Sequence, residues 1–219
     1  MMKIGGLNRS IGSNSKIGCA LGVDFKHLDG ATFMSNRDCY GHLCTNIGAV
    51  WNLVGFYFDG VDDYVRCEDA IVLGNDDFNI DAVVIDLDIA NAPYYLGWWD
   101  SVSAYVRFRS EANQSFDIRF GGVRTEVISS GKTFVDGQEF HLCAKVDRAG
   151  NSEIVVNGDP CGVEVTEAHG SISFTNLFKM GKVETAVGMT GLIKRVRITK
   201  GFADYAARIL ARSIDSRRN

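Results

Sequence analysis

The sequence predicts an all-β protein, a sandwich or jelly roll of two antiparallel sheets packed face to face, with one short helix near the C-terminus. Apolar and polar residues alternate through many short segments between about residues 17 and 200. Gly, Asn and Asp separate these segments, and the chain has 24 glycines but only 2 prolines. A helical apolar period occurs in one late stretch alone. Short strands joined by such turns are typical of sandwiches and jelly rolls.

The first sixteen residues, MMKIGGLNRSIGSNSK, are rich in Gly, Asn and Ser and show no periodicity, so we expect residues 1–16 to form a flexible arm. They also lack the apolar segment of a secretory signal. We therefore expect the protein to remain in the cytoplasm where it is made or to leave inside a larger particle. The β domain is expected to span residues 17–200, and a helix with a basic tail to occupy residues 201–219.

The first clear strand lies in FNIDAVVIDLDIA, residues 78–90. Strict alternation there predicts that Asp86 and Asp88 point to one face and that the opposite face carries Ile85, Leu87 and Ile89. The next aromatic segment, APYYLGWWD, is also expected to be a strand. Its alternation puts Tyr94, Leu96 and Trp98 on one face and Tyr95, Gly97 and Trp99 on the other.

The strand predicted in SAYVRFRS, residues 103–110, places Val106 and Phe108 on one face and Tyr105, Arg107 and Arg109 on the other. SFDIRFGGVRTEVIS, residues 115–129, predicts a hairpin that turns at its Gly-Gly pair. EFHLCAKVDRAGNSEIVVNGDP, residues 139–160, predicts two strands joined at 148–151 and closed by an Asn-Gly turn. LIKRVRIT, residues 192–199, alternates once more.

The predicted helix is FADYAARILARSI, residues 202–214, whose apolar residues fall on one stripe. The chain ends in a small basic patch, which is either a solvated helix face with a frayed end or a surface that docks on an acidic partner. We assign partner binding to three of its arginines: Arg208, Arg212 and Arg217.

Composition excludes several classes of function. The net charge is −4 and the pI about 5.6, which argues against a nucleic-acid-binding surface. No apolar run reaches the roughly 18 residues of a membrane span, so no membrane partner is expected. Six cysteines at irregular spacings predict free thiols rather than a disulfide framework.

A resemblance to a known fold family emerges from four segments in order. FDGVDDYV, residues 58–65, resembles a signature of laminin-G-like, concanavalin A-like jelly-roll domains. DDFNIDAVVIDLDI, DGQEFHLCAKVDRAGNSEIVVNGDP and MTGLIKRVRITKGFADYAARI are similar to later strands of such domains. The resemblance covers about residues 20–210 and implies the fold of the lectin and glucanase superfamily. It does not imply one function, because this fold hosts lectins, glycosidases, adhesion modules and viral structural proteins.

The acids of FDGVDDYV have a structural explanation. Asp59 and Gly60 suit a tight turn, and Asp62 or Asp63 can accept hydrogen bonds from the backbone of the same corner. We expect a turn-and-strand corner here, with a metal site as the alternative.

No constellation of residues predicts catalysis. Glucanases of the resembled superfamily carry glutamates and an aspartate on one strand, and here only Asp86 and Asp88 come near that pattern. We expect these two acids to form a solvated strand face, and the protein not to be an enzyme. No Ser–His or Cys–His pattern and no phosphate-binding loop is present.

Metals and cofactors are not expected either. The loop that contains Cys39, His42 and Cys44 has no standard zinc spacing. Some relatives in the resembled family hold calcium with an acidic pair before the last strand, where this sequence has Lys194 and Arg195 instead.

The densest aromatic cluster is the best candidate for a ligand site. Sugar rings pack on aromatic faces, and acids bind their hydroxyl groups, so we assign ligand binding to Tyr95, Trp98, Trp99 and Asp100. Contact with another protein and packing in the core are the alternatives.

Two classes of function remain, with a third behind them. The first is a bacteriophage virion component, such as a capsid-decoration or tail protein, assembled in the host cytoplasm with other virion proteins or as a homo-oligomer. The second is a lectin module that recognises cell-surface glycan. A glycosidase or polysaccharide lyase is the third.

Overall fold

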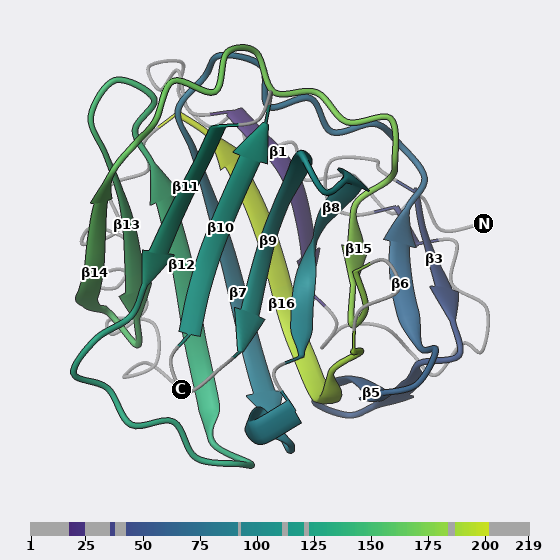
Figure 1. The fold of residues 1–219 in the computed structure, drawn as a ribbon. Helices are drawn as coiled ribbons and strands as arrows, with labels where there is room; N and C mark the ends of the chain where they lie inside the picture. The colour runs from purple at the N-terminus through teal and green to yellow at the C-terminus, as the bar shows by residue number, and fades with distance from the viewer. Residues whose placement is uncertain are drawn as a thin grey trace, which may run out of the picture.

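The computed structural model describes residues 18–24, 36–37, 43–91, 93–110, 114–120, 123–183 and 187–201. These residues form two antiparallel sheets packed face to face, as predicted (Figure 1). The predicted arm, residues 1–16, and the predicted helix, residues 202–214, lie outside the described residues. Within the described part, no helix is long and apolar enough to span a membrane.

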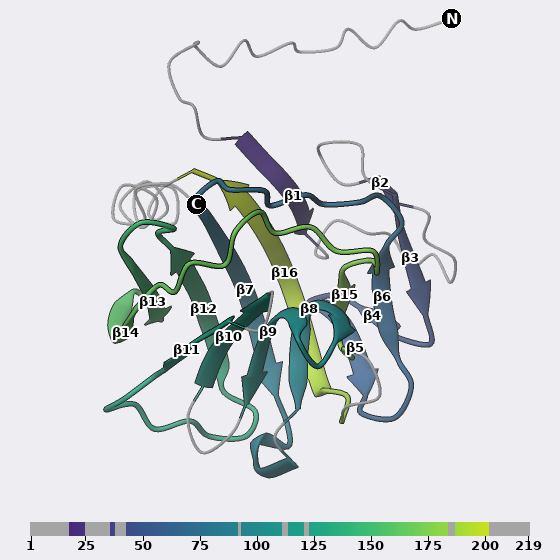
Figure 2. The same cartoon turned by 45° about the horizontal axis from the view of Figure 1, so that its top comes forward.

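The first sheet, called sheet A, contains eight strands. In spatial order seven of them are β14 (Asp159–Val165), β13 (Asn151–Val156), β12 (Glu139–Val146), β7 (Phe78–Asp86), β16 (Thr190–Lys200), β5 (Gly55–Asp59) and β4 (Val50–Asn52). The eighth strand, β1 (Gly18–Asp24), pairs with β16 and lies beside it in Figure 2.

The second sheet, called sheet B, also contains eight strands. Their order is β11 (Val123–Ile128), β10 (Gln114–Phe120), β9 (Ala104–Ser110), β8 (Tyr94–Ser101), β15 (Lys179–Met180), β6 (Tyr64–Cys67), β3 (Leu43–Ile47) and β2 (Asn36–Arg37). A single turn of 3₁₀ helix, η2 (Ile89–Asn91), connects β7 towards β8.

The predicted hairpins are present. β12 and β13 pair across the turn at residues 147–150, and β13 and β14 pair across Asn157 and Gly158. Asn157 has φ 53° and Gly158 has φ 94°, the positive values that an Asn-Gly hairpin turn requires. β10 and β11 pair as the sequence predicted, although the two glycines between them lie outside the described residues.

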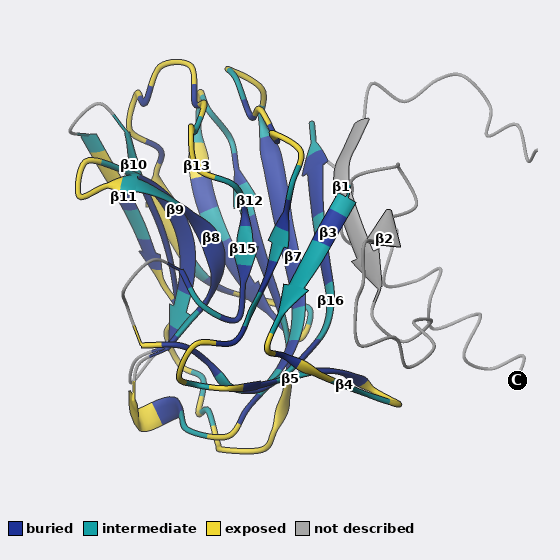
Figure 3. Cartoon of the chain, turned by 90° about the vertical axis from the view of Figure 1, so that its right-hand side faces the viewer, coloured by how far each residue is buried: buried dark blue, intermediate teal, exposed yellow. Residues whose placement is uncertain are grey.

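The core fills the space between the sheets, whose facing sides are buried in Figure 3. Its largest fully buried side chains are aromatic: Trp98, Tyr95, Phe56, Phe58, Phe78, Phe108, Phe116, Phe140 and Phe178. They come from strands of both sheets, so one continuous core holds the two layers together.

The faces of β7 are the reverse of the prediction for its acidic end. Asp86 has no exposed surface, whereas Leu87 is 44% exposed. The strand period of two places Asp86 on the same side as four core residues, Phe78, Ile80, Ala82 and Val84. Its carboxylate accepts hydrogen bonds from Tyr95 Oη at 2.8 Å and from Asp88 N at 3.0 Å. The prediction of a solvated acidic face was therefore wrong for Asp86, and burial raises the pKa of its carboxyl.

Candidate functional site

The outer face of sheet B, the side that points away from the core, gathers aromatic and basic side chains. On β9 the predicted alternation is confirmed: Val106 and Phe108 are fully buried in the core, and the alternate positions point outward. Those positions carry Tyr105, Arg107 and Arg109. The neighbouring strands β8, β10 and β11 add their own outward residues, so the face is built by four adjacent strands.

Strand register arranges these residues in three rows across β8, β9, β10 and β11. The first row, called the aromatic–arginine row, is Trp99, Tyr105, Arg119 and Arg124. The second row is Gly97, Arg107, Asp117 and Glu126, and the third is Tyr94, Arg109, Ser115 and Ile128. Neighbours within a row are directly opposite one another, the closest arrangement that two strands offer to side chains.

Arg107 lies at the centre of this face, against three aromatic rings. Its guanidinium carbon is 4.1 Å from the ring centroid of Tyr105, 4.6 Å from that of Tyr94 and 5.1 Å from that of Trp99. Trp99 and Tyr105 stack on each other at 5.0 Å with an interplanar angle of 5°. These are cation–π distances, so the cation fixes the orientation of the rings.

Gly97 is the residue opposite Arg107 on β8. A Cβ atom at this position would lie 2.1 Å from the carbonyl oxygen of Val106 and 3.0 Å from Cβ of Arg107. The close approach of the two strands therefore requires glycine, because the backbone of β9 and the stem of Arg107 occupy the position that a side chain would take.

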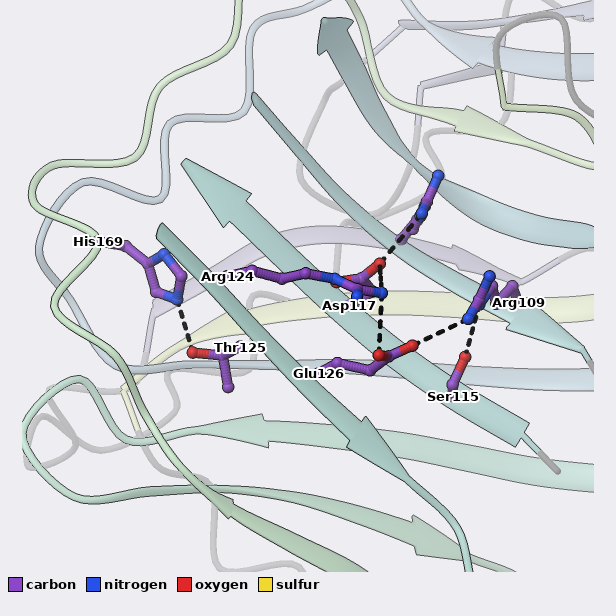
Figure 4. Close-up of polar contacts among 8 residues, drawn as sticks. Arg109, Ser115, Asp117, Arg124, Thr125, Glu126 and His169 are labelled. Carbon is purple, nitrogen blue, oxygen red and sulfur yellow. Dashed lines mark hydrogen bonds and ion pairs between the residues drawn. The ribbon is translucent and has the colours of Figure 1, made fainter. Parts of the chain in front are cut away.

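Two carboxylates bind the arginines of the face to one another (Figure 4). Asp117, which is fully buried, accepts hydrogen bonds from Arg107 Nη2 at 3.1 Å and from Arg124 Nε and Nη2 at 2.9 and 3.0 Å. Glu126 contacts Nη2 of Arg109 and Nη2 of Arg124, both at 2.9 Å. Charge-assisted bonds of this kind hold the side chains in place before any ligand arrives.

Proton affinities follow from the same contacts. The hydrogen bond to Asp117 raises the pKa of Arg124, which stays positively charged. Burial, and then the negative charge of Asp117, raises the pKa of the Tyr105 hydroxyl, which stays neutral. At physiological pH this part of the face therefore has a positive Arg124 and a neutral Tyr105, which is only 4% exposed.

Among the comparisons with known proteins, only the comparison with solved structures finds matches. No family model matches the sequence, and no curated protein does either. The binding domain of botulinum neurotoxin serotype G matches with a TM-score of 0.69 and 14% identity, over 91% of this chain and 51% of that one. The chain thus spans about half the length of that domain.

Two other matches were solved with sugars. Domain 4 of an extracellular arabinanase from Geobacillus stearothermophilus, in complex with arabinotriose, matches with a TM-score of 0.64 and 15% identity, over 85% of this chain and 94% of that one. The ligand binding domain of botulinum neurotoxin serotype D, in complex with N-acetylneuraminic acid, has a TM-score of 0.63 and 10% identity, over 80% and 46%.

The chain folds as a jelly-roll sandwich. At these identities the similarity establishes the fold and leaves function to the residues of this chain.

The jelly roll separates the four residues that the sequence assigned to ligand binding. Trp99 lies on the outer face of sheet B, but Tyr95 and Trp98 are 0% and 1% exposed and belong to the core. A bulge in β8 between Tyr94 and Leu96 inserts one residue, so simple alternation placed Tyr95 on the wrong side. Trp98 stacks on Phe174, with centroids 5.4 Å apart, and a ligand on the surface does not reach it.

Asp100 anchors a loop. Its Oδ1 accepts a hydrogen bond from Asn176 N at 2.7 Å, and its Oδ2 accepts bonds from Thr175 N at 2.7 Å and Thr175 Oγ1 at 3.0 Å. The side-chain Nδ2 of Asn176 donates in turn to the backbone carbonyl of Trp99 at 2.8 Å. Asp100 therefore supports the position of Trp99. The three arginines assigned to partner binding, Arg208, Arg212 and Arg217, lie outside the described residues.

Sequence reasoning missed most of the arginine network. Alternation had placed Tyr105, Arg107 and Arg109 on one face, and that was a usable signal. Nothing in the sequence linked this face to Trp99 or to Asp117, because the link depends on which strands are neighbours and in which register.

The acid-rich corner between β5 and β6 is a hydrogen-bonded turn. Asp59 Oδ1 accepts a bond from Val61 N at 2.8 Å, and Asp63 Oδ2 accepts one from Asp59 N at 2.9 Å. Gly60, with φ 84°, makes the turn possible. These contacts confirm the predicted structural corner. Carboxylate oxygens of Asp59, Asp62 and Asp63 lie within 4.8 Å of one another, and a metal there remains the alternative hypothesis.

The three residues considered for zinc are described only in part. Cys39 and His42 lie outside the described residues. Cys44 points into the core, opposite Cys67, with the two Sγ atoms 3.4 Å apart.

Proposed function

We propose that the protein is a non-catalytic carbohydrate-binding module that holds a glycan on the outer face of sheet B. The carrying observation is the stack of Trp99 on Tyr105, held by the guanidinium of Arg107. Trp99 is half-buried and fixed in advance by Tyr105, so it offers one aromatic face to the apolar side of a sugar ring, and the surrounding arginines can donate to the hydroxyl groups of the sugar. Pre-organised groups lose little conformational freedom when they bind.

Two structures with a similar fold support this proposal, because each was solved with a sugar bound. The arabinanase domain was solved with arabinotriose and the serotype D binding domain with N-acetylneuraminic acid, so jelly rolls similar to this chain occur in sugar-binding proteins. The arabinanase domain is matched over 94% of its length, so that comparison concerns a whole domain.

The same geometry favours binding over catalysis. Glycosidases need one carboxyl group free to protonate the leaving oxygen and a second to act as nucleophile or base. On the outer face of sheet B, Asp117 is buried under two arginines and Glu126 is bonded to two. Asp86 lies in the core. Glycosidase or lyase activity is therefore the weaker proposal.

Replacing Trp99 with alanine tests the proposal. We expect the wild-type protein to bind immobilised glycans and the variant to lose about tenfold or more in affinity, the size of an interface hot spot. Tyr64→Ala is the matched control, because Tyr64 is a half-buried aromatic residue on β6 of the same sheet. Absence of glycan binding at high protein concentration, or equal loss in both variants, would refute the proposed site.

We propose assembly into a virion as a second function, on a different observation. The hairpin of β4 and β5 projects from the sandwich, and its turn is exposed (Figure 3). Val50 is 61% exposed, Leu53 83% and Val54 41%. Clustered exposed apolar residues favour contact with another protein, which suits a particle component assembled in a host cytoplasm from virion proteins or copies of itself.

The expected result for the hairpin is a change of assembly state. Light scattering should show a closed oligomer for the wild-type protein and a smaller species for Leu53→Asp, because a buried charge opposes the contact. Val72→Asp, at a position 51% exposed outside the hairpin, should leave the oligomer intact. A wild-type protein that stays monomeric at all concentrations and is absent from purified particles would contradict this function.

A further inference from the structure

Two arginines lie side by side in the aromatic–arginine row. Arg119 on β10 is directly opposite Arg124 on β11. Like charges at directly opposite positions of a sheet destabilise it, so this pair calls for an explanation. Arg124 forms ion pairs with Asp117 and Glu126, which also contact Arg107 and Arg109.

Arg119 has no such compensation. Among the described residues its side chain has no ion pair, and its Nε atom is buried without a hydrogen-bond partner. A buried donor that lacks an acceptor costs free energy, and an arginine recovers that cost when an anion fills its fork of donors.

The charge balance of the outer face points the same way. Its strands carry six basic side chains in the described residues: Arg66, Arg107, Arg109, Arg119, Arg124 and Lys179. Four carboxylates lie on or next to these strands, those of Glu68, Asp100, Asp117 and Glu126; Asp100 accepts hydrogen bonds from Thr175 and Asn176, and each of the other three already contacts an arginine of the face. The face is therefore positive although the whole chain has a net charge of −4, and it attracts anions.

The position of Arg119 relates this charge to the sugar platform. Arg119 is opposite Tyr105, and Tyr105 is opposite Trp99. The backbone of Arg119 is thus two strand spacings, about 10 Å, from that of Trp99. A sugar ring on Trp99 would direct a substituent along the row over Tyr105 towards the guanidinium.

We propose that the ligand is an acidic glycan and that Arg119, with Arg124 beside it, binds the carboxylate of one of its sugars. This inference rests on the proposed function, because it assumes that the ring lies on Trp99. A guanidinium matches a carboxylate with two parallel hydrogen bonds, which a hydroxyl group cannot replace. Uronic acids and sialic acids share this chemistry.

The experiment compares glycans that carry carboxylates with glycans that do not. Polygalacturonate is titrated against the same polymer with its carboxylates methyl-esterified, and a sialylated oligosaccharide and neutral arabinan form two further arms. We expect the wild-type protein to bind at least one carboxylated ligand more tightly than the esterified and neutral ones. We expect Arg119→Gln to lower that affinity about tenfold to a hundredfold and to lower the affinity for neutral ligands much less.

Arg66→Gln is the matched control. Arg66 lies on β6, four strands from Arg119 and on the other side of Trp99, has a side chain 36% exposed and is paired with Glu68, so the variant removes the same charge away from Arg119. Thermal unfolding checks that both variants are folded. Arg119→Gln should be at least as stable as the wild type, because it removes a like-charge pair.

The outcomes separate the two proposals. Equal affinity for acidic and neutral ligands with dependence on Trp99 overturns the acidic ligand and keeps the proposed function. Equal loss in Arg119→Gln and Arg66→Gln shows a general charge effect and overturns the role of Arg119. No binding of any glycan overturns both proposals.

Discussion

Replacing Trp98 with alanine is expected to destabilise the protein by about 3–5 kcal/mol, the usual cost of removing a buried tryptophan. Trp98 is 1% exposed, and its ring lies 5.4 Å from Phe174 and 4.6 Å from Phe178. The substitution leaves a cavity at the centre of the core that its neighbours fill only in part. Urea unfolding measures the free-energy difference directly.

The adjacent tryptophan is the control for this prediction. Trp99 packs on the outer face against Tyr105 and Arg107, so Trp99→Ala should cost clearly less stability and remove glycan binding instead. Two neighbouring tryptophans thus separate folding from function. A Trp98→Ala protein as stable as the Trp99→Ala protein would contradict the assignment of the two faces of β8.

Replacing Asp117 with asparagine is expected to cost about 3–5 kcal/mol, because it breaks a buried ion pair and leaves one charge uncompensated. Asp117 is fully buried, and the side chain of Arg107 is 9% exposed. Without the carboxylate, the guanidinium of Arg107 keeps its aromatic contacts but loses its counter-charge. Chemical denaturation gives the loss in stability, and glycan titration should show weaker binding as the platform loosens.

Glu126→Gln provides the comparison for Asp117. Glu126 bridges Arg109 and Arg124, but these side chains are 20%, 19% and 41% exposed. Ion pairs in contact with solvent contribute about 0–1 kcal/mol, and less at high salt. Equal losses from Asp117→Asn and Glu126→Gln would show that Asp117 is not the organising charge of the face.

The sequence was sufficient for the architecture because alternation and turn chemistry are local. The strand at 103–110 and the turn at Asn157 and Gly158 follow from residues close in the chain. It failed at the end of β7, where the tertiary partner Tyr95 satisfies Asp86 inside the core. From the sequence, a charged aspartate is expected on the surface, because burying an unpaired charge costs free energy. The hydrogen bond from Tyr95 lowers that cost, and the sequence does not show that the two residues are close.

The site was less predictable than the fold. Trp99 lies on the outer face of sheet B, whereas a bulge that the residue pattern does not reveal places Tyr95 in the core. The aromatic–arginine row combines residues of four strands, and its register is fixed by backbone pairing. The role proposed for Arg119 in particular depends on its neighbours Tyr105 and Arg124, which lie on two other strands.

The central claim is that the outer face of sheet B, and not the acid-rich corner, is where this protein meets its ligand. Nuclear magnetic resonance titration with oligogalacturonate and with arabinotriose tests it most directly. The account predicts shifts of the Trp99 indole N–H and the Arg119 Nε–H, while the indole of Trp98 stays unchanged. Shifts centred on Asp59 and Asp63, or none with either sugar, would contradict it.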